Sequence, residues 1–187
     1  MTRLTILCAL RFILTAVSCF GVAGHAPGSD DPEQIARMIR SARPGDTVTL
    51  PAGTVELGDV TVPPQVSIKG AGYAKTILDA TKFHSGLQVL ENKDVQVSDL
   101  TIRHARGIGL RVSNSSGITV RRIRCLGNGV GVLFDGARDS RLENAVVAEN
   151  RTGLVMVRSH KSVFVNCTAA HNGELAVSLT DNRNCAV

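Results

Sequence analysis

Short runs of alternating apolar and polar residues follow one another along most of the chain. In "GLQVL", "GLRVS" and "GLVMV" the apolar side chains occupy every second position, which is the pattern of a half-buried β-strand. The glycines that open such runs stand at positions 86, 109, 131 and 153, in steps of 23, 22 and 22. A period of this size predicts a repeat architecture.

Each repeat holds three such runs in about 22 residues, which leaves no room for a helix. If the repeats stack as coils with parallel strands roughly 4.8 Å apart, each interior side chain lies on its equivalent one turn away. We therefore predict an all-β parallel solenoid with three short strands per coil. The predicted interior columns are Val89, Val112, Phe134 and Met156; Leu87, Leu110, Val132 and Leu154; Val97, Val120, Leu142 and Phe164; and Ile102, Cys125, Val147 and Ala169.

Two other interpretations of these segments fit the residues less well. A leucine-rich repeat has a similar period, and "LRVSNSSGI" resembles its strand, but the return segment "TVRRIRCLGNG" is itself two strands broken by a corner. The run "GNGVG" resembles a phosphate-binding loop, but no helix follows it and it recurs as a corner. The parallel solenoid remains the favoured architecture.

The segments "ARPGDTVTLPAGTVEL" and "VSIKGAG", with "TILDA" and the 22-residue coils after them, resemble the right-handed parallel β-helix (pectate lyase-like) superfamily over residues 31–187. The resemblance implies a short N-terminal capping helix in "DPEQIARMIRSA", with Asp31 as N-cap, Pro32 in the first turn, and Ile35, Met38 and Ile39 as the buried stripe. Such coils serve lyases, epimerases, hydrolases and adhesins, so they predict the fold and not the activity.

The N-terminal segment predicts export. Basic residues precede a short apolar core, "FILTAVSCFGVA", and then small residues, as in a secretory signal. The core is too short to span a bilayer. We predict a signal peptide over residues 1–23, a linker over 24–30 and the β-helix domain over 31–187, in a secreted, periplasmic or cell-surface protein without a membrane span. A lipoprotein signal at Cys19 is the weaker alternative, because no Leu stands three residues before it.

The last coil ends at "DNRNCAV", inside its second strand and without a polar capping segment. Solenoids normally shield their terminal coils, and an open parallel edge invites association. We therefore expect further coils or a partner at this edge, with the domain incomplete at its C-terminus.

Composition narrows the classes of function. The net charge of +5 is a mild basic tilt and not the dense basic stripe of a nucleic-acid-binding protein. Of the five cysteines, Cys8 and Cys19 lie in the predicted signal peptide. The remaining three, Cys125, Cys167 and Cys185, are odd in number and lack the spacing of a disulfide framework. The sequence has no metal-binding signature, so no cofactor is predicted from the residues; the family resemblance alone implies Ca²⁺.

Two columns of asparagine occupy predicted corners, and we interpret both as structural bends. Asn tolerates left-handed backbone and bonds to neighbouring peptide groups, and stacked Asn side chains can bond to one another. One column precedes the first strand of each coil and the other separates the second and third strands. Their members are Asn128, Asn150 and Asn172, and Asn144 and Asn166, respectively.

The outward column of the first strand predicts little chemistry. It reads Gln88, Arg111, Leu133, Val155 and Val177, with one arginine and no carboxylate. A uronate lyase needs a base and a group that neutralises the carboxylate, and a glycoside hydrolase needs a pair of carboxylates. We therefore expect no complete active site within this chain, and any catalytic residues outside it.

The remaining charged residues suggest a binding surface. A basic patch for a polyanionic glycan is predicted from Arg103, His104, Arg106, Arg111, Arg121 and Arg124, and a charged ridge from Asp94, Asp139, His160 and Lys161. The predicted function is an exported β-helix protein that binds or acts on polysaccharide, most simply an acidic one, in the manner of lyases and epimerases. A non-catalytic surface or adhesion solenoid is the alternative.

Overall fold

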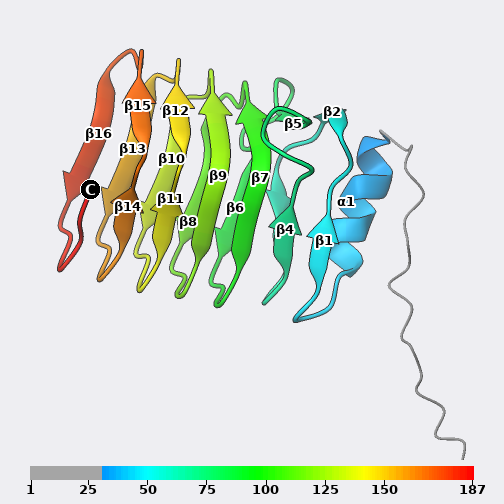
Figure 1. Cartoon of the computed structure of the whole chain (residues 1–187), viewed down its shortest axis with the longest axis horizontal. Coiled ribbons are helices and arrows are strands. Elements are labelled where there is room, and N and C mark those ends of the chain that lie inside the picture. Colours follow the sequence, from blue (N-terminus) through cyan, green and yellow to red (C-terminus); the bar gives the residue numbers. More distant parts are fainter. Residues whose placement is uncertain (1–30) are drawn as a thin grey trace, which may run out of the picture.

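The chain winds into a stack of parallel coils, with the helix at one end and the C-terminus at the other (Figure 1). The computed structural model describes residues 31–187, so the predicted signal peptide and linker lie outside the described residues. In that described range, no helix has the length and apolar character needed to cross a membrane.

Helix α1, Pro32–Ser41, covers the end of the stack next to β1 (Figure 1). The carboxylate of Asp31 accepts a hydrogen bond of 3.0 Å from the backbone N–H of Glu33, and this N-cap fixes where the helix begins. The capping helix is thus confirmed, with one change in its buried stripe. Ala36 is buried with Ile35 and Ile39, whereas Met38 is only partly buried.

The strands that open each coil form one parallel sheet, which we call the first sheet. Its register pairs Val112 with Val89 and with Phe134, and Phe134 with Met156. The predicted inward columns of this sheet are therefore confirmed. Its strands are β3 (Val60–Thr61), β6 (Leu87–Leu90), β8 (Ile108–Ser113), β10 (Val130–Asp135), β13 (Thr152–Val157) and β16 (Leu175–Thr180).

The other strands form a second parallel sheet that is bent along its length. Two of its strands, β7 (Gln96–Arg103) and β9 (Thr119–Leu126), run continuously through the bend where the predicted second and third strands meet. Asp99 and Arg122 stand at the bend with left-handed φ angles of 63° and 49°. The strands of this bent sheet are β1 (Thr47–Thr49), β2 (Gly53–Glu56), β4 (Ser67–Lys69), β5 (Thr76–Asp79), β7 (Gln96–Arg103), β9 (Thr119–Leu126), β11 (Arg141–Glu143), β12 (Val146–Ala148), β14 (Val163–Val165) and β15 (Thr168–Ala170).

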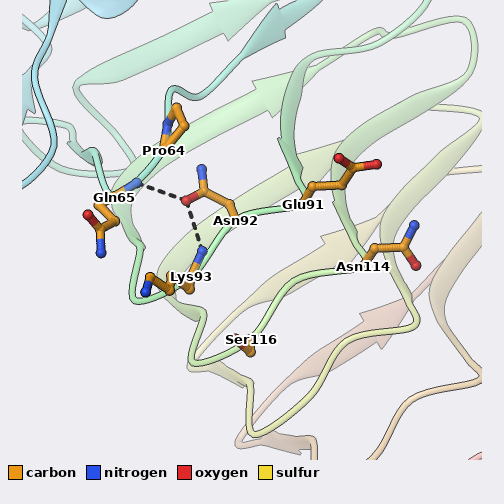
Figure 2. A pocket seen from close by; sticks show the side chains of 7 residues that line it. All are labelled: Pro64, Gln65, Glu91, Asn92, Lys93, Asn114 and Ser116. Atoms are coloured by element: carbon orange, nitrogen blue, oxygen red, sulfur yellow. Dashed lines mark hydrogen bonds between the residues drawn. The ribbon is translucent and has the colours of Figure 1, made fainter.

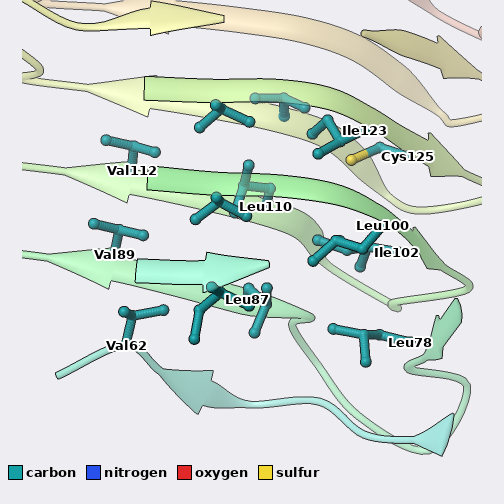
Figure 3. Close-up of a cluster of buried hydrophobic side chains, with 14 of the residues drawn as sticks. Val62, Leu78, Leu87, Val89, Leu100, Ile102, Leu110, Val112, Ile123 and Cys125 are labelled. Carbon is teal, nitrogen blue, oxygen red and sulfur yellow. The ribbon is translucent and has the colours of Figure 1, made fainter. Parts of the chain in front are cut away.

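The core lies between the two sheets, where apolar side chains stack from coil to coil. Figure 3 shows Leu87 and Leu110 of the first sheet facing Leu100, Ile102 and Ile123 of the bent sheet. Further along, the rings of Phe134 and Phe164 meet edge to face, with centroids 5.2 Å apart, an arrangement favoured by aromatic quadrupoles. Burial of these columns is the main stabilising force of the fold.

The last coil departs from the 22-residue register. Val155 pairs with Ser178, and Leu154 pairs with Val177. The prediction that Val177 continues the outward column is therefore wrong: Ser178 holds that position and Val177 faces inward. The cause is local, because Val177 follows Asn172 by five positions, whereas Leu154 follows Asn150 by four.

Candidate functional site

The outer face of the first sheet carries few ionisable groups. Its central column reads Gln88, Arg111, Leu133, Val155 and Ser178. Sequence reasoning missed a neighbouring outward position, Asp135, which the alternation "GVLFD" could have indicated. The carboxylate of Asp135 is ion-paired with Arg158 in the next coil, so it is not a free acid or base.

The carboxylate of Asp79 contacts two of the predicted polyanion-binding residues, Arg103 and His104. It accepts a hydrogen bond from Arg103 Nε at 2.8 Å, and Nδ1 of His104 lies 3.4 Å away. Burial alone would raise the pKa of Asp79, but hydrogen bonds from Thr81 and Arg103 outweigh it and lower the pKa to about 2. Arg103 is therefore paired with a carboxylate of the protein that stays ionised at neutral pH.

Other arginines of the bent sheet are also engaged internally. The guanidinium of Arg124 lies over the ring of Tyr73, 4.2 Å from its centroid, within the range of a cation–π interaction. Arg121 donates to the amide oxygen of Gln96 at 3.2 Å. Arg122 forms a bidentate pair with Asp99, at 2.6 and 2.8 Å, and this pair spans the bend between two coils.

The six predicted polyanion-binding residues do not gather on one face. Arg111 lies on the first sheet, where its Nε donates to Ser113 at 2.9 Å. Arg121 and Arg124 project from β9, on either side of the bend at Arg122. The remaining three are Arg103, at the end of β7, with His104 and Arg106 in the corner that follows. Their role in binding stays a prediction.

The first asparagine column forms a buried ladder. The Nδ2 group of Asn128 donates to Oδ1 of Asn150 at 3.0 Å, and that of Asn150 donates to Oδ1 of Asn172 at 3.1 Å. The same oxygens accept the backbone N–H groups of Asn128 and Asn150, at 2.8 and 3.0 Å. Each amide thus satisfies peptide groups at the corner, where Asn128 and Asn150 are buried and Asn172 is partly buried.

The second asparagine column supports the bend through its left-handed backbone conformation and not, among the described residues, through side-chain hydrogen bonds. Asn144 and Asn166 are exposed and adopt left-handed φ angles of 52° and 51°. They hold the position of Asp99 and Arg122 in the earlier coils. Asparagine is among the few residues that adopt this conformation readily.

A pocket of about 410 Å³ opens beside the turns that follow the strands of the first sheet. We call these turns, residues 91–94, 114–117, 136–139, 158–161 and 181–184, the turn edge. Figure 2 shows Asn92 at the centre of the pocket wall, with its Oδ1 accepting from the backbone N–H groups of Gln65 and Lys93 at 2.8 and 2.9 Å. Its Nδ2 donates to the carbonyls of Val62 and Pro63. Asn92 is therefore fully used in building the wall.

The other polar side chains of the pocket are free. Within residues 31–187 they make no side-chain hydrogen bond or ion pair, and Figure 2 shows them around the same hollow. They are Gln65, Glu91, Lys93, Asn114 and Ser116. Sequence reasoning missed this pocket. The set supplies an ammonium group, a carboxylate, two amides and a hydroxyl, and hence both donors and acceptors.

The described residues do not fit a metal site, because they contain no group of three His, Cys, Asp or Glu side chains that could hold an ion. The Ca²⁺ implied by the family resemblance stays a prediction. Burial raises the pKa of the Cys125 thiol far above its ordinary range, and burial also raises that of Cys167. Both thiols remain protonated and are poor metal ligands or nucleophiles.

The family described as a right-handed β-helix region matches residues 66–187. This match covers more than half of the sequence, so the chain belongs to the right-handed β-helix family. No curated protein matched the sequence.

Several solved structures are similar in fold, including the following three. The A-module of the mannuronan C-5 epimerase AlgE4 from Azotobacter vinelandii is 23% identical, with a TM-score of 0.60 over 80% of this chain and 55% of that chain. ORF18 of Geobacillus virus E2 is 14% identical, with a TM-score of 0.64 over 84% and 45%. An alginate lyase from Paenibacillus is 17% identical, with a TM-score of 0.61 over 81% and 63%. This chain spans less than two thirds of the length of each.

Proposed function

We propose that the protein is an exported β-helix protein that binds polysaccharide. The observation that carries this proposal is the pocket at the turn edge, where free amide, hydroxyl, carboxylate and ammonium groups surround one hollow. Sugar hydroxyls both donate and accept hydrogen bonds, so a mixed set of this kind suits them. Two proteins of similar fold bear the names of enzymes acting on mannuronan and on alginate, which supports the same ligand class.

The proposed ligand is acidic. The chain has a net charge of +5, and Lys93 brings an unpaired ammonium group to the pocket. A uronate carboxylate is the natural partner for such a group. Export, predicted from residues 1–23, would bring the protein to extracellular polysaccharide.

The proposed activity, if the protein is an enzyme, is of the lyase or epimerase type. Two of the coils that line the pocket also carry Gln88 and Arg111 on the outer face of the first sheet, and a cation such as Arg111 neutralises a uronate carboxylate during proton abstraction. A non-catalytic surface or adhesion solenoid is the second candidate. Leu133 and Val155 favour it, because they continue the same column without an acid or base.

Binding and turnover are measured separately. Calorimetric titration of the purified chain with alginate and polygalacturonate tests binding, and the absorbance of unsaturated product, with and without Ca²⁺, tests lyase action. We expect Asn114→Gly to weaken binding roughly tenfold, by removing an amide from the pocket. Gly136 occupies the same turn position with φ 65°, against 49° for Asn114, so this variant keeps the backbone.

Each outcome has a distinct meaning. No binding to either polymer by the wild type overturns the proposal. Binding that Asn114→Gly leaves unchanged removes the pocket as its site. Binding with unsaturated product supports the lyase. Binding without it excludes lyase action, and the nuclear magnetic resonance spectrum of the recovered polymer then separates an epimerase, which changes the uronate composition, from the non-catalytic solenoid, which does not.

A further inference from the structure

One position of the turn edge carries a basic residue in four of five successive coils. Parallel bridges connect Lys93, Ser116, Arg138, His160 and Arg183 in register, and we call these residues the turn row. Adjacent rungs are one strand spacing apart, roughly 4.8 Å. Lys93, at one end of the row, lines the pocket.

The side chains of the turn row are available for a ligand. Lys93, Arg138 and Arg183 are exposed and His160 is half-buried. Within the part of the chain that the structure describes, none of them makes a side-chain hydrogen bond or ion pair. Exposed ammonium and guanidinium groups in a fixed backbone register form a linear array for anions.

The next turn position modifies the charge of the row. It holds Asp94, Gly117, Asp139 and Lys161 in successive coils. Asp94 and Asp139 offset the charge of Lys93 and Arg138, whereas Lys161 places a positive charge beside His160. At these two positions the charges cancel in the coils of Lys93 and Arg138, and positive charge remains in the coils of Lys161 and Arg183.

We propose that the turn row binds the carboxylates of an acidic polysaccharide that runs along the solenoid axis, with one sugar unit in the pocket. This inference rests on the proposed function and specifies how the ligand lies. A linear polyuronate carries one carboxylate per sugar, so a polymer that lies along the axis presents a regular series of carboxylates to the turn row. Single exposed ion pairs contribute little, so the affinity comes from several rungs engaged at once and increases with the length of the oligomer.

The test compares two variants that lose the same charge. Arg138→Ser combined with Arg183→Ser removes two rungs outside the pocket, and serine is what the chain itself holds at Ser116. Arg37→Ala combined with Arg40→Ala removes two exposed arginines from α1, at one end of the stack. Kd is measured by calorimetry with oligouronates of defined length, and thermal unfolding followed by circular dichroism checks that each variant folds.

We expect the turn-row variant to bind long oligouronates roughly tenfold more weakly than the wild type, a loss typical of one or two charge-assisted hydrogen bonds. A disaccharide, which only fills the pocket, binds both proteins equally, and the α1 variant binds long oligomers as the wild type does. Equal loss in the two variants, or no loss in the turn-row variant while the wild type binds, overturns the turn row and leaves the proposed function standing. Absence of wild-type binding removes both proposals.

Discussion

Two corners of the same coils stack polar side chains in different ways: one corner turns them toward one another inside the protein, and the other leaves them exposed. At the corner before each strand of the first sheet, Asn128, Asn150 and Asn172 form a ladder in which the amides bond to one another and to the backbone. At the turn edge after that strand, residues such as Arg138 and Arg183 are in equally regular register, but their side chains have no partner in the described residues. The repeat is the same at both corners, and the use of the polar groups differs.

Burial accounts for the difference. A peptide group enclosed at the ladder corner must find a protein partner, because an unsatisfied buried donor or acceptor costs free energy. The ladder asparagines are therefore constrained by folding. At the turn row water satisfies the exposed side chains, so folding leaves their identity open and a ligand can use them.

The largest expected effect is on the ladder. Asn150→Ala leaves the carbonyls of Cys125 and Ala148 and the N–H of Asn128 without their partner. We expect a loss of about 3 kcal/mol in the free energy of unfolding, since several buried groups are orphaned together. Urea denaturation followed by circular dichroism measures it.

A matched control separates the two asparagine columns. Asn144 is exposed and serves the bend through its left-handed φ of 52°, which glycine adopts readily. Asn144→Gly is expected to change stability by less than about 1 kcal/mol, whereas Asn150→Gly should be as harmful as Asn150→Ala. A rescue of Asn150 by glycine would show that the ladder amides are dispensable.

An intermediate effect on the free energy of unfolding is expected at Asp79, whose carboxylate forms an ion pair with Arg103. Its pKa is about 2 in the folded protein, against an ordinary value of 3.8. The stabilisation is therefore complete above about pH 4 and disappears as the pH falls toward 2. Asp79→Asn should cost about 1.5 kcal/mol at neutral pH, somewhat less than the pKa shift alone implies because solvent screens the pair.

The measurement is a series of urea denaturations between pH 2 and pH 7. The difference between wild type and Asp79→Asn should vanish at the acid end. A difference that stays constant over the whole range would contradict the assigned pairing of Asp79 with Arg103 and Thr81.

The smallest effect is expected at the turn row. Arg138→Ser should change the free energy of unfolding by less than about 0.5 kcal/mol, as for surface positions without partners. Thermal unfolding is a sufficient measurement. A larger loss would mean that the turn row supports the fold, and the contrast between the two corners would then fail.

The coil columns could be predicted because stacking makes the sequence period visible. Phe134 and Met156 pair as their spacing of 22 requires, and the β-helix follows from many such pairs. The shift at Val177 could not be predicted, because one extra residue in a turn leaves the alternation intact while it changes which side chains face inward.

The candidate site was harder to predict because it depends on contacts outside the repeat. The pocket needs Gln65, which belongs to an early coil without the 22-residue spacing, placed by the amide of Asn92. Charge alone also does not distinguish Arg103, paired with Asp79, from Arg138, which has no such partner within residues 31–187. That distinction requires the positions of the carboxylates in neighbouring coils.

The asparagine ladder also has a direction. In both of its amide–amide bonds the Nδ2 donor belongs to the earlier coil and the Oδ1 acceptor to the later one, so the amide dipoles are aligned. Hydrogen bonds in such a chain polarise one another. Asn150, which accepts from Asn128 and donates to Asn172, is consequently expected to be held more strongly than either terminal amide, so the middle coil is where the ladder ties its neighbours together most firmly.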